Sequence, residues 1–166
     1  MEKQHELLAY WQYDTRMWDE FVTIEKGNKR EDNIYFGIGI VIIGTVGLMF
    51  LRGTGFWIGL LCSIPLAILI PWLRMTFSYR YLKKGLKNPE VKIFRDFLLI
   101  NNKKIELTGN RKRIKSLKVI DAKRGLKLLE FDVQWVTAKG PTNDEFRILI
   151  PEEKLATIDE LIQKVY

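Results

Sequence analysis

A chain of 166 residues has room for a membrane hairpin and one small soluble domain. Its net charge is +7 and is uneven, with −3 on residues 1–33 and +9 on residues 74–166. One cysteine and one histidine exclude a disulfide within the chain and a zinc site, and they leave His5 as the one candidate for histidine-based catalysis. A basic domain beside a bilayer indicates anionic lipid headgroups first and a phosphorylated small ligand next. A nucleic acid polymer is not expected as a partner.

The first segment, residues 1–32, predicts a strand followed by an amphipathic helix. Residues 7–13 are rich in aromatic side chains and alternate in polarity, which is typical of a strand. Asp14 or Thr15 can cap a helix whose apolar side holds Met17, Trp18, Phe21, Val22 and Ile24. This helix either lies on the bilayer or packs on its own soluble domain. Its acidic residues favour packing on the domain.

The chain is organised around residues 33–73. Residues 33–51 and 53–73 carry no charge, and Arg52 alone interrupts them, in the turn Arg52-Gly53-Thr54-Gly55. A transmembrane helix needs about 20 mostly apolar residues to cross a hydrocarbon core of about 30 Å. The sequence therefore predicts two transmembrane helices joined by a short turn, with the lipid bilayer as the first partner.

Basic residues near the ends of this hairpin predict its orientation. Lys26, Lys29 and Arg30 precede the first helix, further Lys and Arg residues follow the second within residues 74–88, and the turn carries Arg52 alone. The positive-inside rule then places both termini in the cytoplasm. Neither span contains Asp, Glu, Lys, Arg or His, which favours an anchor over a transporter.

Small residues recur at every fourth position of the second span, at Gly55, Gly59, Ser63 and Ala67. A stripe of this kind lets another helix approach closely. The partner is either the first helix of the same hairpin, which is the favoured interpretation, or a second molecule, which would make a homo-oligomer. Pro65 and Pro71 predict a kink or an early end of this helix.

After a juxtamembrane linker at residues 74–88, residues 89–166 predict a small antiparallel β domain with a C-terminal helix. Strands are expected at residues 91–100, 103–107, 114–121, 126–137 and 146–150, with a turn-rich loop at residues 139–144. Phe131 and Trp135 alternate with acidic residues and are expected in the core. The closing helix opens at Pro151 and buries Leu155, Ile158, Leu161, Ile162 and Val165. The expected fold class is a membrane α-helical hairpin plus an α+β cytoplasmic domain.

Catalytic signals are scarce. The adjacent acids Asp144-Glu145 and Glu152-Glu153 are explained by a turn and by a helix N-terminus. The Gly53-Thr54-Gly55 turn lacks the strand, helix and lysine of a phosphate-binding loop. We therefore expect a protein that is not an enzyme and that uses no cofactor and no metal.

The candidate site that remains is basic. It comprises Arg111, Lys112, Arg113, Lys115, Lys118, Lys123 and Arg124. On a regular strand, Arg113 and Lys115 share one face, while Lys112 and Lys118 share the other. Such a cluster can bind a phosphate or an anionic leaflet. The more common outcome for a charge run of this kind is a solvated face.

Two aromatic motifs, Trp11-x-Tyr13 and Trp18-x-x-Phe21, precede the hairpin, and Ile148-Leu149-Ile150-Pro151-Glu152 opens the closing helix. Together with the order of elements, they resemble small bacterial proteins that have two transmembrane helices and a pleckstrin-homology-like C-terminal domain. The resemblance implies a partly open β barrel capped by residues 151–165 and completed by the N-terminal strand. It also implies an inner-membrane protein that acts as a sensor or an interaction module.

The architecture is also similar to that of two-helix effectors of nucleotide-signalled antiphage defence. In such effectors the β domain binds a cyclic nucleotide, and the hairpins assemble and breach the inner membrane. This likeness implies that the small-residue stripe serves assembly and that the basic residues 111–115 bind the nucleotide.

Overall fold

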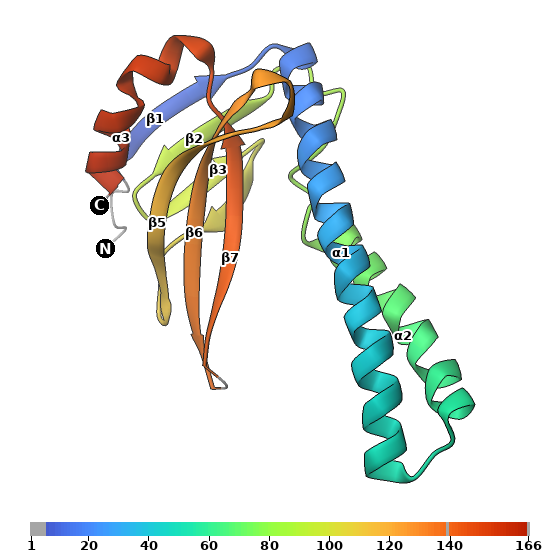
Figure 1. Ribbon diagram of the computed structural model, residues 1–166. Helices are drawn as coiled ribbons and strands as arrows, with labels where there is room; N and C mark the ends of the chain where they lie inside the picture. Colours follow the sequence, from blue (N-terminus) through green and yellow to red (C-terminus); the bar gives the residue numbers. More distant parts are fainter. Residues whose placement is uncertain (1–5, 139, 166) are drawn as a thin grey trace. The chain divides into compact units, whose positions relative to one another are not determined.

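The computed structural model describes residues 6–138 and 140–165, and the chain forms two compact units (Figure 1). The first, called here the β unit, joins the residues up to Ile24 to those from Lys83 onward. The second, the hairpin unit, is Glu25–Leu82. His5, the histidine considered above, lies outside the described residues.

Two long helices form the hairpin, α1 (Thr15–Arg52) and α2 (Phe56–Phe77), and both are long and apolar enough to cross a membrane. The sequence predicted an amphipathic helix and a separate first transmembrane helix before the turn at Arg52, but the two form one continuous helix, α1. No proline separates them, and Gly27 alone does not end a helix. Helix α2 continues through Pro65 and Pro71 to Phe77, so the expected early end is not observed. Gly53 adopts a φ of +63° in the turn, a conformation that glycine tolerates best.

Within the hairpin unit, small residues let α1 and α2 approach closely. A Cβ atom added at Gly37 would lie 3.0 Å from the Ala67 carbonyl oxygen, and one at Gly44 would lie 2.6 Å from the Ser63 hydroxyl. A Cβ at Gly59 would lie 3.1 Å from the Thr45 carbonyl oxygen. Three members of the predicted stripe, Gly59, Ser63 and Ala67, therefore face α1. Gly55 has open space around it and precedes the first residue of α2.

The β unit contains two antiparallel sheets. One has the order β1-β2-β3-β4, and the other has the order β5-β6-β7. The strands are β1 (Leu7–Gln12), β2 (Glu90–Phe94), β3 (Phe97–Ile100), β4 (Lys103–Glu106), β5 (Lys112–Asp121), β6 (Lys127–Thr137) and β7 (Gly140–Leu149). The hairpin is inserted between β1 and β2, which pair with each other. Strands from before and after the hairpin thus build one sheet, β1 from before it and β2, β3 and β4 from after it.

Two of the expected strand boundaries are wrong. Residues 91–100 form two strands, since the chain turns at Asp96, whose carbonyl oxygen accepts hydrogen bonds from the backbone N–H groups of Leu107 and Thr108. Residues 140–144 belong to β7 instead of a loop, and Thr142 pairs with Trp135. Six strands therefore follow the hairpin where five were expected.

The C-terminus forms a 3₁₀ helix, Glu152–Thr157, followed by α3 (Ile158–Val165). The single helix expected from Pro151 is thus divided into two helical segments. Ile158, Leu161 and Val165 are buried, as expected from the apolar stripe, whereas Leu155 and Ile162 are half-buried. Figure 1 shows α3 beside β1.

The start of α1 packs on the β unit. Trp18, Phe21 and Val22 are fully buried. The Trp18 ring centroid lies 5.4 Å from that of Tyr13, and its indole N–H donates a 2.8 Å hydrogen bond to the Lys83 carbonyl oxygen. Burial raises the pKa of Tyr13, whose hydroxyl donates to the Leu149 carbonyl oxygen at 2.7 Å. The first turns of the helix therefore pack within the β unit, as predicted.

Candidate anion-binding site

A tight turn at the start of β5 positions two of the predicted basic residues. The Gly109 N–H donates to the Lys112 carbonyl oxygen at 3.0 Å, and the Lys112 N–H donates back to the Gly109 carbonyl oxygen at 3.2 Å. Arg111 closes the turn with a φ of +71°, which is uncommon for a residue with a side chain. Its carbonyl oxygen accepts a 2.8 Å hydrogen bond from the Val136 N–H. The turn is thereby fixed against the end of β6.

Beside this turn lies a pocket of about 270 Å³. It is lined by Glu106, Gly109, Asn110, Arg111, Lys112, Trp135 and Val136. Basic, amide and aromatic side chains thus meet at one hollow, and the acidic Glu106 is ion-paired with Lys104 at 3.5 Å. We call this hollow the tip pocket.

Lys112 is the central cation of the tip pocket. Its Nζ atom lies 4.3 Å from the centroid of the Trp135 ring and 5.8 Å from that of Phe146, so the ammonium is held over aromatic faces. Partial burial lowers the pKa of Lys112, while Glu106 and Asp144 act in the opposite direction. The two ring contacts therefore fix the position of its ammonium group.

Trp135 is not in the core, although its alternation with acidic residues predicted that it would be. Its side chain is 41% exposed, whereas Phe131 on the same strand is fully buried. Trp135 pairs with Lys112 near the far end of β6, and next to it Val136 is exposed as well. Trp135, Asn110 and Glu106 were not among the candidate site residues predicted from the sequence. The adjacent, exposed pair Trp135-Val136 at a strand end is the signal that indicates the pocket.

The prediction that Lys112 and Lys118 share one face of a strand is wrong, because β5 contains a bulge. The pairing with β6 shifts between Ile114 and Ser116, which leaves Lys115 as the extra residue. Lys112 consequently pairs with Trp135, on the face that holds Leu117 and Phe131, whereas Lys118 pairs with Glu130 on the opposite face. Lys112 and Lys118 do not share a face.

Most other members of the basic cluster already have partners on the protein. Lys115 pairs with Asp132 at 3.5 Å, Lys118 with Glu130 at 3.0 Å, and Arg124 with Glu20 at 3.0 Å. The Arg113 guanidinium donates to the Gln134 side-chain oxygen at 2.8 Å. Lys123 is exposed in a short 3₁₀ helix (Lys123–Gly125), outside the tip pocket. Of the seven predicted residues, Arg111 and Lys112 line the tip pocket and the other five do not.

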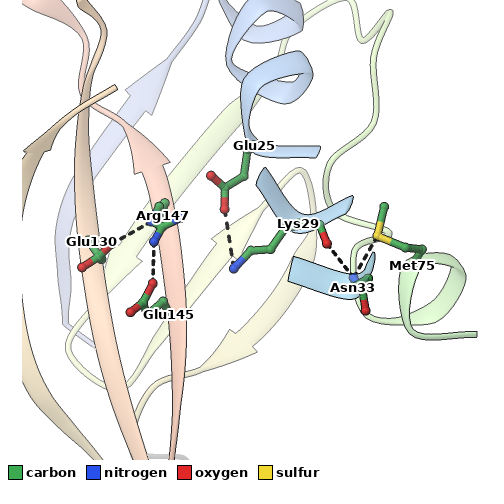
Figure 2. Close-up of polar contacts among 7 residues, drawn as sticks. All are labelled: Glu25, Lys29, Asn33, Met75, Glu130, Glu145 and Arg147. Carbon is green, nitrogen blue, oxygen red and sulfur yellow. Dashed lines mark hydrogen bonds and ion pairs between the residues drawn. The ribbon is translucent and has the colours of Figure 1, made fainter. Parts of the chain in front are cut away.

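On the face of the sheet β5-β6-β7 opposite Phe131, the buried Glu130 carboxylate is the centre of a network of ion pairs (Figure 2). Glu130 accepts a 2.7 Å hydrogen bond from Arg147 Nε, and Arg147 also contacts Glu145. Burial acts to raise the pKa of Glu130, but the hydrogen bonds from Arg147 and Lys118 outweigh it and hold this pKa below its usual range. This network neutralises its own charges, so we assign it a structural role.

Among residues 6–138 and 140–165, no group of three or more His, Cys, Asp or Glu side chains is arranged to hold a metal ion. Comparison of the chain with models of known protein families, with curated proteins and with solved structures found no match.

Proposed function

We propose that this protein is a non-enzymatic membrane protein whose pleckstrin-homology-like domain binds a phosphodiester anion at the tip pocket. The observation that carries the proposal is that some basic residues of the cluster are ion-paired with acids, whereas two others line the tip pocket. Lys115, Lys118 and Arg124 are paired with acids, whereas Arg111 and Lys112 line a hollow beside an exposed Trp135. A charge-assisted hydrogen bond from such a cation is among the stronger polar contacts a protein can offer a phosphate.

The charge of the pocket indicates which kind of anion it binds. Two cations and one carboxylate, Glu106, line it. A monoanion such as a phosphodiester suits this balance better than the dianion of a phosphate monoester. Phospholipid headgroups and cyclic nucleotides share the phosphodiester group, and both also suit a pocket with an aromatic wall.

The arrangement of strands supports the domain assignment. Four strands in one sheet, three in the other and a closing helix agree with the pleckstrin-like architecture that the sequence motifs imply. β1 supplies a strand that the segment after the hairpin lacks by itself. We propose that the two sheets form a partly open barrel.

The insertion of the hairpin between β1 and β2 supports the membrane part of the proposal. Because the chain runs from β1 into α1 and from α2 back to β2, two connections instead of one join the domain to the membrane hairpin. Together with the positive-inside rule, this insertion supports a β domain and two termini on the cytoplasmic side of a bacterial inner membrane. The domain then acts there as a sensor or an interaction module.

The alternative is an antiphage effector in which a cyclic nucleotide occupies the tip pocket and the hairpins oligomerise. Trp135 favours it, because an exposed aromatic ring can stack on a base. Assembly through the small-residue stripe is disfavoured, since Gly59, Ser63 and Ala67 already face α1. An oligomer would have to use other faces of the hairpin.

The proposal predicts that Lys112→Gln weakens phosphodiester binding at least about tenfold, because a charge-assisted hydrogen bond contributes about 1.5–3 kcal/mol. Lys123→Gln is the matched control, since it removes the same charge from an exposed site outside the pocket. The pKa of Lys112 is lowered, so this side chain loses its positive charge at a lower pH than an ordinary lysine does. As the pH rises, phosphodiester binding by the wild type should therefore weaken before ordinary lysines lose their charge.

Native mass spectrometry in detergent measures this binding, with glycerophosphoglycerol and a panel of cyclic nucleotides as ligands. Binding of the headgroup analogue at constant oligomer number supports the interaction module. Binding of a nucleotide with a rise in oligomer number supports the effector. Equal loss of binding in Lys112→Gln and Lys123→Gln would contradict the tip pocket as the site.

A further inference from the structure

We infer that the hairpin unit holds one anionic phospholipid at a fixed place, in a groove between α1 and α2. The groove has a volume of about 460 Å³. Its walls are mostly apolar and include Ile38, Val41, Pro71 and Trp72. Arg30 is the charged side chain that lines it. The inference rests on the membrane location of the hairpin and does not depend on the tip pocket.

The length of the groove matches one leaflet. It extends along α1 from Arg30 to Val41. At a rise of 1.5 Å per residue, this is about 16 Å, or about half of a hydrocarbon core of about 30 Å. One acyl chain that lies along the groove therefore reaches from its charged end to the middle of the bilayer.

The polar end of the groove is held in place by a contact between the two helices. The Asn33 side-chain amide donates to the Lys29 carbonyl oxygen at 2.7 Å and to the Met75 sulfur at 3.2 Å (Figure 2). Asn33 and Met75 both line the groove. Since Asn33 is buried, this contact fixes the separation of α1 and α2 where a headgroup would lie.

Arg30 gives the groove a preference for a lipid with a negatively charged headgroup. The structure assigns it no ion pair with any described residue, and it is exposed at the end of the groove where α1 enters the bilayer. A guanidinium group there suits a lipid phosphate in geometry and in charge. A phospholipid with a net negative charge, such as phosphatidylglycerol, is favoured over phosphatidylcholine, whose own cation offsets its phosphate.

Native mass spectrometry of the full chain in detergent, with phosphatidylglycerol or phosphatidylcholine added, tests the inference. We expect one phosphatidylglycerol to remain bound through activation that strips phosphatidylcholine. Arg30→Gln should lower its retention about fivefold, the effect of about one basic residue near an anionic lipid. Arg52→Gln is the matched control, because it removes the same charge from the other end of α1.

A second pair of variants tests the apolar part of the groove. Ile38→Trp fills it and should lower phosphatidylglycerol retention at least tenfold, whereas Ile43→Trp adds the same ring on α1 outside the groove and should leave retention unchanged. Equal retention in all four variants, or of both lipids, would overturn the inference. A chain that stays monodisperse without detergent would instead refute the membrane location and, with it, the membrane part of the proposed function.

Discussion

Trp18→Ala should lower the free energy of unfolding of the β unit by about 3–5 kcal/mol, the cost of removing a large aromatic side chain from a packed core. Trp18 is fully buried, and its ring contacts both Tyr13 and Phe21 at centroid distances of 5.4 and 5.3 Å. The truncation also leaves the Lys83 carbonyl oxygen without its indole donor. Hydrogen–deuterium exchange of peptides from β6 and β7 measures the loss as faster exchange.

Trp18→Phe separates the contribution of ring packing from that of the indole hydrogen bond, because it keeps an aromatic ring and removes the N–H donor. We expect it to cost about 1–2 kcal/mol, less than the truncation. Trp57→Ala is the control, since Trp57 is largely exposed on α2 and should leave exchange in β6 and β7 unchanged. An effect of Trp18→Ala as small as that of Trp57→Ala would contradict the packing of α1 on the β unit.

Gly44→Leu should force α1 and α2 apart and destabilise the hairpin by about 1–3 kcal/mol, as expected for overpacking a close contact. Even a Cβ at this position would lie 2.6 Å from the Ser63 hydroxyl and 3.2 Å from the Ser63 Cβ. That hydroxyl is already engaged, because it donates to the Gly59 carbonyl oxygen at 2.8 Å. The larger leucine side chain cannot be accommodated by rotating the serine alone.

Gly47→Leu is the matched control, because a Cβ at Gly47 meets nothing within 4 Å. Spin labels at positions 35 and 77, in a Cys62→Ser background, report the separation of the helices by electron paramagnetic resonance. Gly44→Leu should lengthen and broaden the distance distribution, and Gly47→Leu should not. A longer distance in both variants, or in neither, would show that Gly44 is not a contact point between α1 and α2.

The elements that depend on local sequence could be predicted. The two uncharged runs, residues 33–51 and 53–73, each have about the length of a membrane span, so the sequence alone predicted a hairpin of two long apolar helices. The alternation in residues 7–13 likewise predicted β1. The break at Asp96 could not be predicted in the same way, because its carbonyl oxygen is held by Leu107 and Thr108, which follow about ten residues later. Nothing in residues 91–100 alone indicates that contact.

The sequence predicted that the candidate site contains basic residues, but it did not predict which of them line the pocket. The basic residues were evident from the sequence, and Arg111 and Lys112 do line a pocket. Lys115 and Lys118 are instead paired with Asp132 and Glu130 on the neighbouring strand, and that pairing depends on the register. The bulge at Lys115 shifts the register by one residue, which changes the face of every later side chain. A one-residue irregularity of this kind leaves no clear trace in the sequence.

The measurement that tests the account most directly is the sidedness of the two units in a membrane. In a Cys62→Ser background, Gly55→Cys marks the turn of the hairpin and Lys123→Cys marks the β unit. A membrane-impermeant maleimide should label Gly55→Cys in right-side-out vesicles and Lys123→Cys in inside-out vesicles. Labelling of both variants from the same side would contradict a spanning hairpin that presents a cytoplasmic β domain.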